Sequence, residues 1–309
     1  MGINLMYEFK FQDKLALAAS YESLDNNLHA IQIYTALIHE DETYLESYFR
    51  LVELYEKTGR IEEASAVIEK MVDINNRNEH ALITAAEFYL FHSKWPEALA
   101  VMYFIDSADF PIIHFWKGLC YYNLNQFESA IVTLKESYKY YKNEDYTAQV
   151  ILLLAKVEFE LRNFKSALQY AEKYDYIDSN NWEINLFFAK IYLEMDMLTH
   201  ASQKISLALH KKKNNVEIIK TAARIYYKND ELEKAEKYFN LVIENSDDVS
   251  AEFYSNMASL AFKRKDINKA KLYYELALKI DPEYEAAVNA LNTISSKKTG
   301  LIKNDQNNF

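Results

Sequence analysis

The chain of 309 residues is 50% hydrophobic and 15% aromatic, which is enough apolar material for a packed core and excludes an intrinsically disordered chain. It contains only 4 Gly and 3 Pro, whereas sheet-based folds use these residues at most of their turns. The composition therefore predicts an all-α protein. Residues 1–150 carry 12 basic and 23 acidic side chains, whereas residues 151–309 carry 23 of each, so the net charge of −11 lies in the first half. This acidic excess disfavours nucleic acid as a partner.

No segment of the sequence indicates export or membrane insertion. The single cysteine, Cys120, cannot form an internal disulfide. The first ten residues lack the charged and apolar regions of a signal peptide. No apolar run approaches the roughly 20 residues that cross a bilayer. We therefore expect a cytoplasmic protein without a membrane partner.

An internal period runs through most of the chain. An alanine recurs at spacings of 34, 34, 32, 37, 34, 34 and 35 residues, and a second small or modest residue lies 12 positions before each of these alanines. Two small residues in each period allow a pair of helices to pack closely. The recurring alanines are Ala30, Ala64, Ala98, Ala130, Ala167, Ala201, Ala235 and Ala270.

The period predicts eight amphipathic helix pairs, preceded by a lead-in at residues 1–10 and spanning residues 11–284. The steps of 32 and 37 residues flank the fourth pair, where we expect irregular stacking. Residues 285–296 continue a helical pattern that predicts a cap on the last pair. Residues 297–309 are polar and are expected to form a disordered tail. The helix pairs are expected to start near residues 11, 45, 79, 111, 148, 182, 216 and 251.

These units resemble the tetratricopeptide repeat, whose pattern has a small residue at position 8, Tyr at 11, Ala at 20, an aromatic residue at 24, Ala at 27 and Pro at 32. When Ala251 is counted as position 1, the last unit matches at Ala258, Ala270, Tyr274, Ala277 and Pro282. The resemblance implies a right-handed α-solenoid of helix-turn-helix repeats. It also implies a non-enzymatic scaffold that binds a peptide or partner segment in a concave groove.

The fifth unit departs from this pattern at Glu158, which occupies the position where six other units have Tyr. A buried unpaired carboxylate is costly, so we expect Glu158 to turn outward and meet Arg162. The alternatives are a core that is open to solvent at this point, or a buried carboxylate with a partner.

The sequence contains no recognisable catalytic or metal-binding motif. No two of its seven histidines are three or four residues apart, and it lacks a Gly-rich phosphate loop and a Gly-x-Ser-x-Gly motif. We therefore expect no metal, no cofactor and no enzymatic activity. Two other classes stay open, an RNA-binding helical-repeat protein and, less favoured, a helical enzyme whose active site joins residues distant in the sequence.

In the resembled family the first helix of each repeat lines the groove. The second and third units place Glu46, Glu53, Glu56 and Glu87 there, whereas the fourth unit has no charge, and from the fifth unit onward the stripe is basic and aromatic. The basic stripe predicts an acidic partner segment in the C-terminal half. The pattern carries no signal for an oligomeric state. The candidate partner-binding residues are Phe115, Tyr122, Lys156, Phe159, Lys190, Lys220, Arg224, Tyr227 and Asn256.

Four of these candidates have alternative interpretations. Phe115 and Tyr122 could instead pack within the solenoid, since first helices also touch one another. Lys220 and Asn256 match the carboxylate clamp of co-chaperones within the family, but Arg224 replaces the first Asn of that clamp and its third element is missing. We therefore do not expect a standard chaperone clamp, and we retain the expectation of an anionic ligand.

Overall fold

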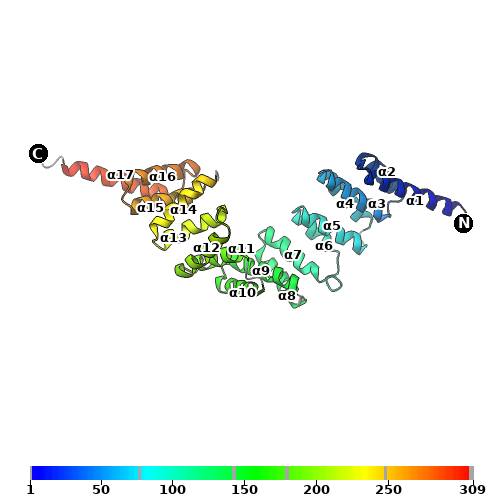
Figure 1. Ribbon diagram of the computed structural model, residues 1–309, viewed down its shortest axis with the longest axis horizontal. Coiled ribbons are helices and arrows are strands. Elements are labelled where there is room, and N and C mark those ends of the chain that lie inside the picture. The colour runs from blue at the N-terminus through cyan, green and yellow to red at the C-terminus, as the bar shows by residue number, and fades with distance from the viewer. Residues whose placement is uncertain (1, 76–77, 141–143, 178–180, 247–248, 306–309) are drawn as a thin grey trace. The chain divides into compact units, whose positions relative to one another are not determined.

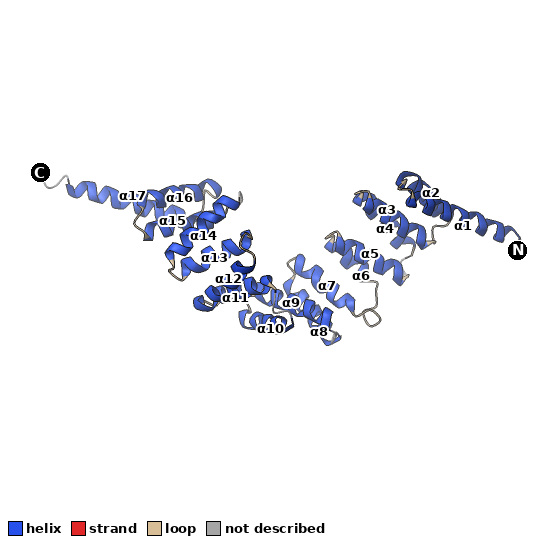
Figure 2. Ribbon diagram, in the orientation of Figure 1, coloured by secondary structure: helices blue, strands red, loops and turns tan. Residues whose placement is uncertain are grey.

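A computed structural model describes residues 2–75, 78–140, 144–177, 181–246 and 249–305. In these ranges every regular element is an α-helix, and the helices are joined by turns and loops (Figure 2). The described part of the chain contains no strand. This confirms the all-α fold expected from the composition.

The helices alternate between the first and the second helix of each repeat (Figure 1). The first helices are α1 (Gly2–Ser23), α3 (Leu45–Lys57), α5 (Glu79–Phe91), α7 (Ile112–Asn123), α9 (Glu144–Glu160), α11 (Trp182–Glu194), α13 (Val216–Lys228) and α15 (Ala251–Lys263). The second helices are α2 (Asn27–Glu40), α4 (Ile61–Ile74), α6 (Trp95–Met102), α8 (Phe127–Tyr140), α10 (Phe164–Ile177), α12 (Leu198–Lys211), α14 (Leu232–Asn245) and α16 (Ile267–Ile280). A final helix, α17 (Glu285–Asp305), follows them.

The chain divides into two compact units, Met1–Leu153 (unit 1) and Leu154–Phe309 (unit 2), and unit 2 begins inside α9. In unit 1 each helix from α1 to α7 packs against the helix that follows it. In unit 2 the same holds from α10 to α16, and α17 packs against α16. Each unit is therefore a stack of helix hairpins that contact their neighbours in the sequence, which is the construction of a solenoid.

The periodic alanines form the close contact inside each hairpin. All eight, from Ala30 to Ala270, are completely buried. The small residues that precede them, such as Ala189 and Ala223, are buried as well. At Gly118 an added Cβ would lie 2.6 Å from the side chain of Leu134, so a larger residue there would require Leu134 to shift. The small-residue period is thus a packing requirement of the hairpin.

The turn between the two helices of each hairpin has one conformation throughout. Five residues before each alanine the backbone is left-handed, with φ between 57° and 72°. The next amide donates to the carbonyl five residues earlier, as Asn26 does to Tyr21 and Lys94 to Tyr89. This pattern is a Schellman motif, which ends one helix and turns the chain into the next.

Side-chain caps fix the starts of several first helices. Asn78, Asn215 and Ser250 each accept a hydrogen bond from the backbone amide three residues later, and Asn181 accepts one from Glu183. These bonds satisfy amides that have no partner inside the helix. The first helices α5, α11, α13 and α15 therefore begin at fixed residues, which sets the register of the side chains on their outer face.

The irregular spacing around the fourth repeat has two structural causes. Helix α6 has 8 residues, whereas the other described second helices have 14 each. Helix α9 has 17 residues, compared with 13 in α11. The loss of turns at the end of α6 shortens one step of the period, and the longer α9 extends the next.

Three expectations differ from the structure. Glu158 is buried and accepts a hydrogen bond of 2.9 Å from Asn163, so the outward turn toward Arg162 is wrong. Arg162 lies instead 3.9 Å from Glu194 of the next repeat. Helix α17 continues to Asp305, well past residue 296, although residues 297–309 were expected to be disordered; residues 306–309 lie outside the described part. Helix α1 begins at Gly2, inside the expected lead-in.

Candidate functional site

The first helices of unit 2 bring three of the candidate residues into one hollow. Lys220, Arg224 and Asn256 line a cavity of about 140 Å³ between α13 and α15, with Thr221 and Phe253 at its buried base. The two cations lie one turn apart on α13, and Asn256 faces them from α15. The arrangement can hold a carboxylate or an amide of an extended chain, since it offers charged and neutral hydrogen-bond donors.

Two cations of the stripe, Lys190 and Arg224, each have a carboxylate partner from the next repeat. Lys190 Nζ lies 2.7 Å from Glu217, and Arg224 lies 3.3 Å from Glu252. Both glutamates occupy the second position of a first helix and also line the hollow. The charges of Lys190 and Arg224 are therefore neutralised locally in the unbound chain. Sequence reasoning missed Glu217 and Glu252, although each stands one residue after the expected start of a first helix.

Lys156 and Phe159 occupy the start of the same face. Lys156 is half-buried and has no ion-pair partner among the residues that the structure describes. The ring of Phe159 lies 5.5 Å from that of Phe164 and 5.6 Å from that of Phe187, measured between centroids. Phe187, which sequence reasoning did not single out, extends this apolar surface onto α11. A free cation therefore lies one turn from an aromatic cluster.

Tyr227 takes part in the packing of its own repeat. Its ring lies 6.1 Å from that of Phe239, and the ammonium of Lys263 lies 5.0 Å from its centroid. Lys263 also contacts Asp230 at 2.8 Å, which raises the pKa of Lys263. Tyr227 is half-buried, so its surface contribution is smaller than the sequence suggests.

The two candidates in unit 1 lie on α7. Phe115 is half-buried, and Tyr122 is half-buried with its ring 6.0 Å from that of Phe127. Tyr122 also has a further interaction. Part of the surface of both side chains is therefore buried within the fourth hairpin. The nine candidates fall into two groups, with Phe115 and Tyr122 in unit 1 and the remaining seven in unit 2.

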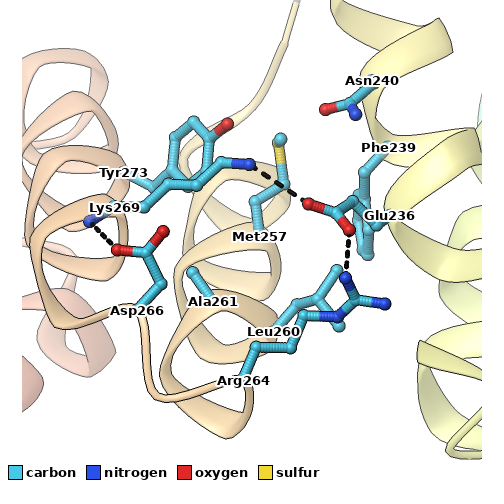
Figure 3. Close-up of a pocket in the computed structure, with 10 residues that line it drawn as sticks. All are labelled: Glu236, Phe239, Asn240, Met257, Leu260, Ala261, Arg264, Asp266, Lys269 and Tyr273. Atoms are coloured by element: carbon cyan, nitrogen blue, oxygen red, sulfur yellow. Dashed lines mark hydrogen bonds and ion pairs between the residues drawn. The ribbon is translucent and has the colours of Figure 1, made fainter. Parts of the chain in front are cut away.

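A second hollow in unit 2 lies among α14, α15 and α16 and has a volume of about 250 Å³. Figure 3 shows the Glu236 carboxylate between the side chains of Arg264 and Lys269. The hydrogen bond of 3.1 Å from Lys269 to Glu236 raises the pKa of Lys269. The charged groups of this hollow satisfy one another, so it connects two repeats and offers no free charge to a ligand.

Two further observations concern the described residues alone. Within them, no three histidine, cysteine, aspartate or glutamate side chains are grouped so that they could hold a metal ion. No helix in the same residues combines the length and the hydropathy that crossing a bilayer requires.

Family models for the tetratricopeptide repeat match residues 27–86, 112–144, 221–248 and 251–284, which together make up about half of the chain. No curated protein matches the sequence. The fold, the turns and these matches define a helical-repeat protein. The chain belongs to the tetratricopeptide repeat family. As a member of this family, it is a scaffold for protein–protein interaction.

Several solved structures are similar to this chain. The hetero-tetramer Cut9–Hcn1 of the APC/C is similar over 87% of this chain, with a TM-score of 0.60 and 15% identity. The chain spans 52% of the length of that protein. MamA from Desulfovibrio magneticus RS-1 is similar over 56% of this chain and 96% of its own, with 11% identity and a TM-score of 0.49. A tetratricopeptide repeat protein from Parabacteroides merdae is similar over 92% of this chain and 98% of its own, with 11% identity and a TM-score of 0.45.

Proposed function

We propose that the chain is a non-enzymatic adaptor whose unit 2 binds an extended, acidic segment of a partner protein on the face formed by α9, α11, α13 and α15. The single observation that carries the proposal is the hollow that gathers Lys220, Arg224 and Asn256. Lys190 lies one repeat earlier on the same stripe, so an extended chain can contact both places. The repeated spacing of the donors suits a ligand with carboxylates at intervals along its length.

Glu217 and Glu252 act as internal competitors of the ligand. They hold Lys190 and Arg224 in place before binding, and the ligand's carboxylates replace them. Exchanging one carboxylate for another yields little net free energy. The charges therefore select an acidic segment and accelerate its association, whereas they add little to the affinity.

Apolar anchors supply most of the affinity in this proposal. Phe159 and Phe187 present a half-buried aromatic surface beside the unpaired Lys156. Tyr227 offers a smaller edge near the hollow. Aromatic side chains that become fully desolvated dominate binding energies in most interfaces. An acidic segment that carries an aromatic or aliphatic residue is thus the expected ligand.

The test uses a short fluorescent peptide that contains several glutamates and one phenylalanine, with fluorescence anisotropy on the full chain. Lys190→Gln combined with Arg224→Gln should weaken binding about threefold to tenfold, since each exposed pair is worth about 0.2–1 kcal/mol. The matched control combines Lys212→Gln with Lys213→Gln, two exposed lysines away from the stripe. Equal losses in the two double variants, or no loss in the first, would overturn the proposed site.

A second variant tests the competition directly. Glu217→Gln combined with Glu252→Gln removes the internal carboxylates and should strengthen binding of the acidic peptide. It should also make binding more sensitive to salt, because the released cations are then screened by ions instead of by fixed partners. Weaker binding in this variant would show that the two glutamates contact the ligand or support the fold. A single-stranded RNA that bound as tightly as the peptide, with the same response to the variants, would favour the RNA-binding class.

A further inference from the structure

Unit 1 carries a hollow of opposite character on the face of α3 and α5. Its volume is about 470 Å³, and it is more than three times as large as the hollow around Arg224. Helix α3 contributes Glu46, Glu53 and Glu56 to its lining, and α5 contributes Glu87. Helices α3 and α5 are the first helices of two successive repeats. The packing between those repeats therefore holds the walls of the hollow in place.

The carboxylates of this hollow exceed the cations that could neutralise them. Arg50 pairs with Glu46 at 2.9 Å and with Glu53 at 3.3 Å, and it is the only lysine or arginine among the described lining residues. Glu56 lies 2.7 Å from the imidazole of His92. Within the described residues Glu87 has no ion-pair partner. The whole of residues 1–150 is acidic as well, so the field around the hollow attracts cations from a distance.

Aromatic side chains line the hollow alongside the carboxylates. The rings of Phe49 and His80 lie 4.7 Å apart between centroids and connect α3 to α5. At the end of α5, Phe91 also lines the hollow and is 82% exposed, the highest exposure of any phenylalanine in the described residues. Its nearest ring is that of His92, at 5.1 Å. Most of the Phe91 ring is therefore free to be covered by a ligand.

From this combination we infer that the hollow binds an extended segment of a partner protein that presents arginine next to an apolar residue. The planar guanidinium forms paired hydrogen bonds with a carboxylate and stacks on an aromatic ring, so Glu53, Glu87 and Phe91 together fit arginine better than lysine. The neighbouring apolar residue covers Phe49. The hollow in unit 1 thus takes a basic segment.

This binding is separate from the function proposed for unit 2. The two hollows lie in different units and have opposite charge preference, so an acidic peptide and an arginine peptide report on them independently. Variants in unit 1 should leave binding of the acidic peptide unchanged. A result that removes one activity and keeps the other therefore identifies which of the two assignments is wrong.

The test measures binding of a short fluorescent peptide that contains two arginines and one phenylalanine to the full chain. Replacing both arginines by citrulline, which keeps the shape and removes the charge, should abolish most of the binding. Glu53→Gln combined with Glu87→Gln should weaken it about tenfold. Phe91→Ala should weaken it about fivefold without any change of charge.

The matched control is Glu69→Gln combined with Glu97→Gln, two exposed glutamates on α4 and α6 that do not line the hollow. This variant should change affinity by less than about twofold, because only the distant field is altered. Equal weakening in both double variants would mean that the peptide responds to net charge alone and would overturn the site. So would equal binding of the citrulline peptide. Circular dichroism of each variant verifies that the helices are intact.

Discussion

At the scale of single residues, the turns inside the hairpins use left-handed backbone at eight places, and only one of the eight residues is glycine. Gly59 has φ of 72°, whereas Lys265 at the equivalent place in the last repeat has φ of 65°. A residue with a Cβ in this region costs roughly 1 kcal/mol relative to glycine. The Schellman motif offsets this cost by satisfying the last carbonyls of the first helix.

This comparison predicts opposite effects for two substitutions. Lys265→Gly should raise the free energy of unfolding by about 0.5–1 kcal/mol, because it relieves the backbone. Gly59→Ala should lower it by about 1 kcal/mol, since no heavy atom lies within 4 Å of the added Cβ and the cost is conformational only. Urea unfolding of the full chain measures both. Effects of the same sign would contradict the assignment.

Buried titratable groups predict how stability depends on pH. Burial raises the pKa of the Cys120 thiol from 9.0 to about 12 and, as the main cause, raises the pKa of Tyr48 and Tyr89 from 10.0 to about 12. The folded chain therefore favours the neutral forms. Their contribution is complete below the unfolded pKa values and is lost as the pH rises toward the folded ones.

We accordingly expect the melting temperature to be constant between about pH 7 and 8 and to fall above about pH 9, where the unfolded thiol ionises. The slope due to Cys120 should be about 1 kcal/mol per pH unit between pH 9 and 12. In Cys120→Ala the decline should begin nearer pH 10, where unfolded tyrosines ionise. An identical onset in both proteins would show that Cys120 is not the group responsible.

At the scale of helices, the hairpins depend on close contact between small residues, and the ion pairs between repeats are secondary. Ala235 and Glu236 are neighbours on α14 and illustrate the difference. Ala235 is fully buried against the rest of its hairpin, whereas Glu236 reaches Arg264 and Lys269 of the next repeat at a partly exposed place (Figure 3). Adding volume to a side chain in a packed core destabilises the fold. Exposed ion pairs, in contrast, contribute little to the free energy of unfolding.

Ala235→Leu should therefore lower the free energy of unfolding by about 1–3 kcal/mol through overpacking. Glu236→Gln, one residue away, should lower it by less than about 1 kcal/mol. The same large loss is expected for Ala201→Leu. Thermal unfolding followed by circular dichroism compares the three variants. Unchanged stability in both leucine variants would argue strongly against the role of these alanines in hairpin packing.

At the scale of the whole molecule, the chain consists of two compact units, and the irregular repeats precede their boundary. The short α6 is followed by Tyr103 and Phe104, which are exposed and contact each other edge to face at 5.6 Å. In a solenoid each repeat is stabilised only by its neighbours. The short α6 and the long α9 flank the fourth hairpin, so this stretch is a natural place for unfolding to begin.

We therefore expect the full chain to unfold in two steps. The packing between neighbouring repeats should be weakest at residues 105–147. Native-state hydrogen exchange followed by mass spectrometry should show faster exchange in peptides from this stretch than in the hairpins on either side. Uniform protection along the chain, together with a single urea transition, would contradict this prediction.

The sequence determined the fold because each hairpin is specified locally. The alanine period requires contacts between residues about 12 positions apart, and helical side-chain spacing fixes which faces meet. The buried alanines, the helix starts at Leu45 and Ala251 and the family assignment all follow from this local rule. Three residues that the sequence singled out, Lys220, Arg224 and Asn256, line one hollow, whereas their role in binding a partner stays a prediction.

What surrounds each charge was decided by the tertiary structure. Lys190 and Arg224 pair with Glu217 and Glu252 of the next repeat, and Glu158 accepts a hydrogen bond from Asn163 inside the core. Long side chains have several rotamers that differ by about 1 kcal/mol or less. The rotation between successive repeats therefore decides which hydrogen-bond or ion-pair partner each charged side chain reaches, and the sequence alone does not distinguish these partners. The hollow beside Phe91 also depends on the tertiary structure, because its lining residues come from α3 and α5, which belong to different repeats.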